Sequence, residues 1–307
     1  MTPDRLRELA TVVNNWGRWG TDDERGTLNL ITDAARARGA SCVRTGKAFS
    51  LALPLSAAGP QLGQTPGRTN PHRWMVSINE ALPGDRSGLG VNDDAVLMGL
   101  QAASHWDALA HVSFRGQLYN GFPASTVTSN GATRCGIDKV GVVAGRGILL
   151  DVAAAKGADR LEGGKAITGA DLDDAERQAG LDVLPGDIVL VRTGQIRLLK
   201  EGRRTEYPVP CPGLSVSAVE WFRRRDIAAV ATDNYVFEVY PYEAAELRLP
   251  VHRLCLVEMG LLLGENWDLE ALSADCAADR VYEFLLTATP EPFTCGLGGP
   301  VHPVALK

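Results

Sequence analysis

Apolar runs alternate with helical patterns most clearly after residue 140. Residues 145–154 (GRGILLDVAA) and 187–193 (DIVLVRT) are short apolar runs bounded by glycine, as expected for buried strands. Between them, residues 167–180 have the periodic pattern of a helix, which we expect to begin at Thr168 because threonine is a good N-cap.

A second helix is predicted over residues 215–226 (SVSAVEWFRRRD), where Ser217 and Glu220 have the spacing of a capping box. This helix leads directly into the apolar run 227–232, which we expect to be a strand closed by Asp233. An order in which strands and helices alternate predicts an α/β core.

The remaining segments fit the same class and indicate one domain. We expect a capped helix after Thr2-Pro3, strands at 47–55 and 74–78 with a long polar loop between them, a buried segment at 250–266, a helix at 269–279 and a late strand at 280–290. No internal repeat, low-complexity segment or linker is apparent. We therefore expect one domain over residues 33–307, preceded by an N-terminal helix and arm over residues 1–32.

Composition excludes several classes of partner. The chain has 307 residues, 45% hydrophobic and 22% charged, with a net charge of −6, which is typical of a globular protein that buries a large core. An acidic chain without a basic stripe is not expected to bind nucleic acid. No apolar run reaches the roughly 18 residues that cross a bilayer, and no signal peptide is recognisable. With six cysteines scattered singly, we expect a cytoplasmic protein that does not bind a membrane.

Standard catalytic motifs are absent, but one segment is dense in chemistry-bearing residues. The segment QAASHWDALAH contains Gln101, His105, Asp107 and His111 among Ala, Leu and Trp. All four have the same parity, so an extended chain would place neighbours such as His105 and Asp107 on one side. Desolvated imidazoles and carboxylates need partners. Two interpretations are open: a divalent metal held by this pair, or a hydrogen-bonded His–Asp pair in the core.

Two further positions are candidates. His252 and Glu265 flank an apolar run that also contains Glu258, although a lone histidine in such a run is also typical of a protein core. Asp233 lies at the carboxyl end of a predicted strand, where α/β proteins tend to bind ligands. Aspartate is also a common turn residue.

The segment QAASHWDALAH resembles the hallmark HxGTHxDxPxH of the cyclase family, which includes bacterial kynurenine formamidases and isatin hydrolases. It aligns without a gap at His105, Asp107 and His111. The resemblance continues through GILLDVA, PGDIVLVRTG, the AVATD strand end, LPVH and GEN, and so covers most of residues 45–270. It implies a cyclase-like (swivelling β/β/α) fold, a single α/β domain with a mixed β-sheet core flanked by helices.

The resemblance also implies roles for individual residues. In the family, the first two histidines and the aspartate of the hallmark hold a divalent metal, usually zinc or manganese. Here these positions are Gln101, His105 and Asp107. His111 is implied as the general base or acid, and His252 with Glu265 would complete the site as supporting catalytic residues or as ligands of a second metal.

One position departs from the hallmark. Gln101 stands where the family has its first histidine, and Ala103-Ser104 replaces Gly-Thr. Glutamine can ligate a metal through its carbonyl oxygen, which favours harder ions such as manganese or magnesium. The alternative is that the metal is lost and that His105 and Asp107 serve hydrogen bonding or acid–base chemistry.

These residues predict a hydrolase that opens the C–N or C–O bond of a small amide, lactam or lactone with a metal-activated water. A metal-independent cyclase or dehydratase acting on a small polar or aromatic substrate is the alternative, and an inactive binding protein is a third interpretation. We expect Trp106, Phe114, Tyr119 and Asp233 to contact the substrate. The resemblance implies a homodimer or homotetramer, and we expect residues 1–32 to pack across the subunit interface.

Overall fold

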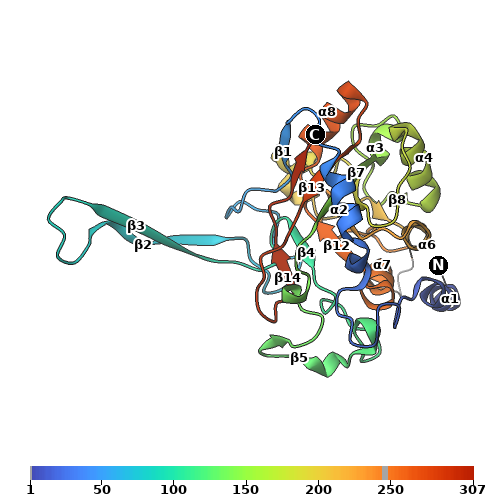
Figure 1. Ribbon diagram of the computed structural model, residues 1–307, viewed down its shortest axis with the longest axis horizontal. Coiled ribbons are helices and arrows are strands. Elements are labelled where there is room, and N and C mark those ends of the chain that lie inside the picture. Colours follow the sequence, from blue (N-terminus) through green and yellow to red (C-terminus); the bar gives the residue numbers. More distant parts are fainter. Residues whose placement is uncertain (1, 244–247) are drawn as a thin grey trace.

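A nine-stranded mixed sheet forms the centre of the computed structural model, which describes residues 2–243 and 248–307 (Figure 1). Strands β7, β9, β11 and β12 run parallel, and their neighbours on both sides pair antiparallel. In spatial order the strands are β1 (Ala48–Ser50), β15 (Val304–Leu306), β13 (Glu283–Thr287), β7 (Ala144–Asp151), β9 (Ile188–Arg192), β11 (Ala229–Thr232), β12 (Leu262–Glu265), β4 (His105–Asp107) and β14 (Gly298–Pro300). The expected α/β domain with a mixed sheet is confirmed.

Helices flank this sheet. Helix α2 packs on β7 and β13, α4 contacts β7, and α6 contacts both α4 and α1. The helices are α1 (Pro3–Val13), α2 (Asp33–Ala40), α3 (Val152–Ala155), α4 (Gly169–Ala179), α5 (Arg197–Lys200), α6 (Val216–Arg225), α7 (Pro250–His252), which continues into the π-helical turn η6 (Arg253–Met259), and α8 (Glu270–Asp279). No helix in the described part of the chain is both long and apolar enough to span a membrane.

Short elements complete the fold. Three small sheets lie outside the central one: β2 (His72–Ala81) with β3 (Gly90–Leu97), β5 (Val127–Thr128) with β6 (Gly131–Ala132), and β8 (Ala166–Ile167) with β10 (Gly213–Leu214). The 3₁₀ turns are η1 (Gly26–Leu30), η2 (Tyr119–Gly121), η3 (Ala124–Thr126), η4 (Ile137–Lys139) and η5 (Arg204–Glu206).

The central parallel strands form where the sequence has continuous apolar runs. The residues of β9 and β11 are all buried, as expected for strands covered on both faces. Helix α4 begins after Thr168, as predicted: the Thr168 hydroxyl accepts a hydrogen bond from the Asp171 N–H, and the Asp171 carboxylate accepts one from the Thr168 N–H. Gly180 ends the helix with a φ of 68°.

The predicted capping box of the next helix is wrong, because the N-cap lies two residues before Ser217. The N-cap of α6 is Ser215, whose Oγ accepts a hydrogen bond from the Ser217 N–H at 3.1 Å. Glu243 accepts a further bond from the Val216 N–H at 2.7 Å. Ser215 and Glu243 thus accept hydrogen bonds from the first N–H groups of α6. Glu220 is not needed as a cap and pairs instead with Arg5 of α1.

The N-terminal helix forms as predicted, and its apolar face packs on other elements of the same chain. The Thr2 hydroxyl caps α1, and the apolar face with Leu6, Leu9 and Val13 is buried against α6 and η6. Trp16, in the arm that follows, donates its indole N–H to the Val257 carbonyl oxygen at 2.7 Å. A contact of residues 1–32 with another subunit stays a prediction.

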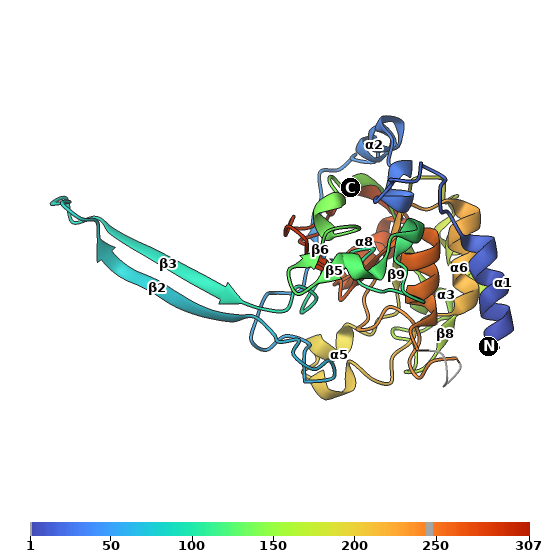
Figure 2. The ribbon, with the colours of Figure 1, turned by 90° about the horizontal axis from the view of Figure 1, so that it is seen from below.

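Strands β2 and β3 form a hairpin that projects far from the rest of the molecule (Figures 1 and 2). The sequence pattern predicts a strand only at 74–78, whereas β2 extends from His72 to Ala81. Strand β3 has no predicted counterpart, because its sequence GVNDDAVL lacks the apolar run of a buried strand.

Candidate metal centre

The short strand β4 places the central candidate residues on one face of the sheet. It lies between β12 and β14, with Glu265 opposite His105 and Gly298 opposite Asp107. Side chains two residues apart on a strand point to the same side, and directly opposed residues share that side. His105, Asp107 and Glu265 therefore converge, as the parity argument predicts for the first two.

Trp106 points to the other face and belongs to the core. Its ring packs edge-on against Trp267, with centroids 4.9 Å apart, and its indole N–H donates to the Ala288 carbonyl oxygen at 2.7 Å. Gly264 lies opposite, where an added Cβ would approach the Trp106 ring to 3.0 Å. The expected contact of Trp106 with substrate is thus wrong, because the residue between two site residues on a strand must face away from them.

Two imidazoles and two carboxylates meet at short range. The His252 Nε2 atom lies 3.3 Å from Glu265 Oε1 and 3.8 Å from Asp107 Oδ2. The His105 Nε2 atom lies 3.4 Å from Asp107 Oδ1 and 3.6 Å from Glu265 Oε2. Asp107, His252 and Glu265 each present a ligand atom within 4.8 Å of the others, a spacing that could hold a metal ion.

The orientation of His105 favours a cation in this group. Its Nδ1 atom lies 2.7 Å from the Ala103 carbonyl oxygen, so Nδ1 carries the hydrogen and Nε2 presents a lone pair when the ring is neutral. That lone pair faces carboxylate oxygens, and both His105 Nε2 and Asp107 Oδ1 are buried without a hydrogen-bond partner. Since electron-rich atoms repel one another unless a positive charge lies between them, this donor set fits a divalent metal.

Glu238 orients His252, and sequence reasoning missed it. The buried Glu238 carboxylate accepts hydrogen bonds from the Val251 and His252 N–H groups and lies 2.6 Å from His252 Nδ1. The bond at Nδ1 directs Nε2 toward Asp107 and Glu265. The signal in the sequence is an acidic residue inside the apolar segment VFEVY, but nothing in that segment links it to a histidine further along the chain.

The electrostatics follow from burial and this mixture of charges. Burial alone would lower the pKa of His252, but hydrogen bonds to Glu238 and Glu265 offset it and raise the pKa to about 10. Burial opposes ionisation of Asp107, yet nearby His111, His105 and His252 hold its pKa well below the usual range. The pKa of His111 is lowered, chiefly by burial and then by positive charge on His252 and Arg68.

Asp107, His252 and Glu265 line a cavity of about 910 Å³. His111 lies in it, with Nε2 3.7 Å from Asp107 Oδ1 and its side chain partly exposed. The walls combine aromatic, apolar and cationic side chains and are made by Gln64, Thr65, Arg68, Val209, Tyr235, Val236, Tyr240, Pro241, Tyr242, Arg248 and Leu249. Such a lining suits a small molecule with an apolar body and few polar groups.

Gln101 lies beside the cluster but not in the cavity lining. Its side-chain nitrogen occupies the space next to Gly298, where an added Cβ would lie 2.5 Å from it. Because Gly298 is directly opposite Asp107, this space is on the same face of the sheet as the Asp107 carboxylate.

Tyr119 and Phe114, which were also predicted to contact the substrate, lie outside the cavity lining. Tyr119 is buried against the backbone of Gly260, and its hydroxyl lies 3.0 Å from the Asp23 carboxylate. Phe114 packs under the Arg253 guanidinium, 3.4 Å from the ring centroid. These contacts correct the expectation that Tyr119 and Phe114 form a substrate wall.

Asp233 closes β11, as predicted, but its carboxylate is already occupied. It accepts hydrogen bonds from the Thr193 N–H and hydroxyl and from the Gly194 N–H, at 2.7 to 2.8 Å. Burial raises its pKa to about 6. Asp233 therefore ties the loop after β9 to the end of β11 instead of lining the cavity.

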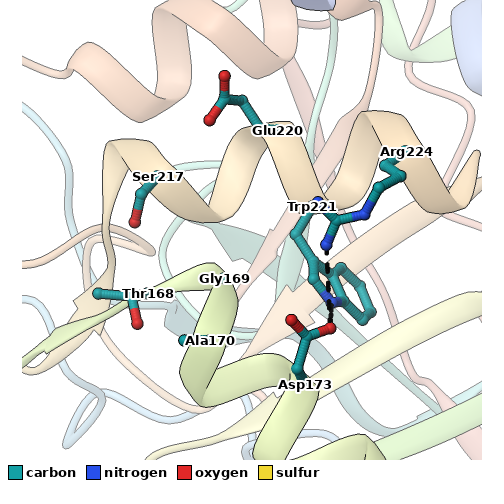
Figure 3. A pocket seen from close by; sticks show the side chains of 8 residues that line it. All are labelled: Thr168, Gly169, Ala170, Asp173, Ser217, Glu220, Trp221 and Arg224. Carbon is teal, nitrogen blue, oxygen red and sulfur yellow. Dashed lines mark hydrogen bonds and ion pairs between the residues drawn. The ribbon is translucent and has the colours of Figure 1, made fainter.

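A second hollow lies between α4 and α6 (Figure 3). Its polar groups serve the helices: Thr168 caps α4, and Asp173 accepts a hydrogen bond from the Trp221 indole N–H at 2.7 Å. Arg224 lies 3.9 Å from the same carboxylate. No comparable convergence of histidines and carboxylates occurs there, so we assign the chemistry to the cavity above β4.

Comparisons with known proteins identify the family of this chain. The model of a family described as "Putative cyclase" matches residues 49–239. A solved structure described as a novel cyclase is 38% identical, with a TM-score of 0.88 over 96% of this chain and 100% of that one. No match is found among curated protein sequences.

More distant solved structures share the fold. Isatin hydrolase A from Labrenzia aggregata is 18% identical, with a TM-score of 0.63 over 87% of this chain and 94% of its own. A protein from Bacillus stearothermophilus described as a "predicted metal-dependent hydrolase" is 16% identical, with a TM-score of 0.53 over 85% and 98% of the two chains.

Replacing Glu238 tests its role in orienting His252. We expect Glu238→Gln to weaken binding of added zinc or manganese by about 10-fold to 100-fold, the usual effect of removing the carboxylate behind a ligating histidine. Affinity would be measured by competition with a chromophoric chelator. Glu176→Gln is the control, since Glu176 is also a buried glutamate but lies in α4 and accepts a bond from the Val183 N–H. Equal affinity in both variants would contradict the assignment.

Proposed function

Because the chain belongs to the cyclase family, we propose that it is a metal-dependent hydrolase that opens the C–N bond of a small amide or lactam, or the C–O bond of a lactone. The observation that carries this proposal is the meeting of Asp107, His252 and Glu265 in the lining of a cavity. His105 lies directly beside them, and its Nε2 atom and Asp107 Oδ1 are buried without a hydrogen-bond partner. The fold shared with isatin hydrolase A supports a hydrolytic reaction.

The proposed metal ligands are Asp107, His252 and Glu265, with His105 beside them. This set retains His105 and Asp107 from the sequence prediction. His252 and Glu265, expected as supporting catalytic residues or as ligands of a second metal, are here proposed as ligands of the same metal. Two imidazoles and two carboxylates suit zinc or manganese. The unpaired thiols of all six cysteines support the cytoplasm as the compartment.

The reaction needs a nucleophile, a base and a proton donor. A bound divalent cation supplies a Lewis acid and lowers the pKa of water. His111, with its lowered pKa, is neutral and accepts the proton of the attacking water. The water oxygen bonds to the carbonyl carbon, the C–N bond breaks, and His111 returns the proton to the departing nitrogen. The aromatic walls hold the substrate and exclude bulk water.

The proposal is tested by a screen of N-formyl arylamines, lactams, lactones and cyclic imides with and without added zinc and manganese. Asp107→Asn should lower bound metal and hydrolysis together, because it removes a charge with little change in volume. Asp94→Asn is the control, since Asp94 is exposed on β3 and pairs with Arg73. Activity that is independent of metal would favour the cyclase or dehydratase, and absence of both metal and activity would favour a binding protein.

His111→Ala separates a proton-transfer role from a structural one. We expect turnover to fall about 100-fold to 10,000-fold, the range for a lost general base, while metal content stays near wild type. Elemental analysis and thermal unfolding accompany the kinetics. Lower stability with turnover preserved in the folded fraction would indicate a core histidine, and loss of metal would make His111 a ligand.

The cavity also suggests the charge of the substrate. Arg68 lines the cavity and has no side-chain hydrogen bond or ion pair within residues 2–243 and 248–307. Its positive charge adds to the lowering of the His111 pKa by burial, and it opposes the raising of the Tyr235 pKa by burial. A guanidinium with free donors beside aromatic rings fits a carboxylate attached to an aromatic body. We therefore propose an anionic aromatic substrate.

Matched substrates test the role of Arg68. For Arg68→Gln we expect kcat/KM to fall about 10-fold to 100-fold for N-formyl-2-aminobenzoate, because a hydrogen bond to a charged group is lost. The value for neutral formanilide should not change. Arg177→Gln, on the exposed side of α4, should leave both unchanged. Equal losses for the two substrates would show that Arg68 does not select the charge.

A further inference from the structure

We infer that a hollow beside α8, at the carboxyl ends of β7 and β9, binds a small carboxylate through Arg280 and Tyr282. The hollow has a volume of about 280 Å³ and is lined by residues of α3, α4 and α8. It shares no lining residue with the cavity above β4. The inference therefore does not depend on the proposed function.

The sheet places this hollow where α/β proteins bind ligands. Asp151 is the last residue of β7 and Arg192 the last of β9, and the two lie directly opposite each other in the parallel pair. Both residues line the hollow. Ligands of open α/β sheets bind outside the carboxyl ends of the strands, so the position is suited to a binding site.

The charges at the base of the hollow neutralise one another. The Arg192 guanidinium donates to both oxygens of Asp151, at 2.9 and 3.2 Å, and to both oxygens of Glu270, at 2.7 and 3.0 Å. The Ser273 hydroxyl also donates to Asp151. Because each of these acids is bound to a guanidinium, neither presents an uncompensated negative charge to a ligand.

Tyr282 points to a ligand in the hollow. Its side chain lines the hollow and the residue is only 4% exposed. Its hydroxyl nevertheless has no hydrogen bond in the part of the chain that the structure describes. Buried tyrosines normally give their hydroxyl a partner. The Tyr282 hydroxyl is therefore a free donor that a molecule bound in the hollow would satisfy.

Arg280 supplies the positive charge. It is the C-cap of α8, lines the hollow, and makes no side-chain hydrogen bond or ion pair among residues 2–243 and 248–307. Burial raises the pKa of Tyr282, and the charge of Arg280 opposes that rise, which places the guanidinium near the hydroxyl. A guanidinium and a phenol hydroxyl side by side are donors that suit the two oxygens of a carboxylate.

The rest of the lining limits the ligand to a small monoanion. Four alanines of the lining, Ala154, Ala158, Ala274 and Ala277, offer apolar contact without polar groups. A volume of 280 Å³ is slightly below the roughly 300–1,000 Å³ of pockets for drug-sized molecules, so the apolar body is short. Asp159 is the one acid of the lining that has no ion pair in the described residues. Its charge disfavours a dianion such as phosphate.

Binding of propionate, with neutral propionamide as its matched analogue, tests the inference. Affinity would be measured by ligand-observed NMR at constant ionic strength. We expect Arg280→Gln to weaken propionate binding about 10-fold to 100-fold and Tyr282→Phe about 10-fold, because each removes a hydrogen bond to a charged group. Propionamide should bind at least about 10-fold more weakly than propionate to the wild type and should not respond to either substitution.

Two control variants separate this hollow from other sites. Arg36→Gln, on the exposed side of α2, should leave propionate affinity unchanged. Arg68→Gln should also leave it unchanged, since Arg68 lines the other cavity. Tyr282→Phe should unfold at the wild-type temperature, because its hydroxyl has no partner in the described part of the chain.

Three results would overturn the inference. The first is a wild type that does not bind propionate, or that binds propionamide equally well. The second is unchanged propionate affinity in both Arg280→Gln and Tyr282→Phe. The third is a loss of affinity in Arg68→Gln alone, which would place the carboxylate in the cavity above β4.

Discussion

Two carboxylates buried side by side are the constraint on which the centre of this protein depends. Asp107 and Glu265 are both about 96% or more shielded from solvent, and Glu238 is buried behind His252. Desolvated like charges cost several kcal/mol per ion unless positive charge compensates them. Three histidines surround the two acids, and a divalent cation among them would remove the remaining repulsion. Binding of such a cation would therefore also stabilise this region.

One short strand, β4, holds the buried carboxylates in position. On one face of β4, His105 and Asp107 meet Glu265, and on the other face Trp106 anchors the strand in the core. Gly264 leaves the space that the Trp106 ring requires. Because the strand is fixed from its core face, the acidic face is held in position despite its repulsion. The arrangement explains how a strand of three residues can support a charged site.

The sequence predicts those parts of the fold that obey a local rule. Continuous apolar runs identify β7, β9 and β11, and parity places His105 and Asp107 together. The same parity excludes Trp106 from the site, a consequence that the sequence analysis did not draw. Glu238 could not be assigned, because its link to His252 depends on how the loop after β11 and the helix after Leu249 approach each other. Only residues 74–78 of the hairpin formed by β2 and β3 were predicted as a strand. Strand β3 was missed because an exposed hairpin does not need the apolar pattern of a buried strand.

The register of β14 defines where the Gln101 side chain lies. Gly298, opposite Asp107, has no side chain, and the Gln101 amide fills that space on the acidic face. The position is set by strand pairing and by the missing side chain. An amide offers an oxygen and a nitrogen whose places can exchange by rotation, and here the nitrogen faces Gly298. The side chains that present ligand atoms close together are Asp107, His252 and Glu265. Ligation of a metal by the Gln101 oxygen would require that rotation, and it stays a prediction.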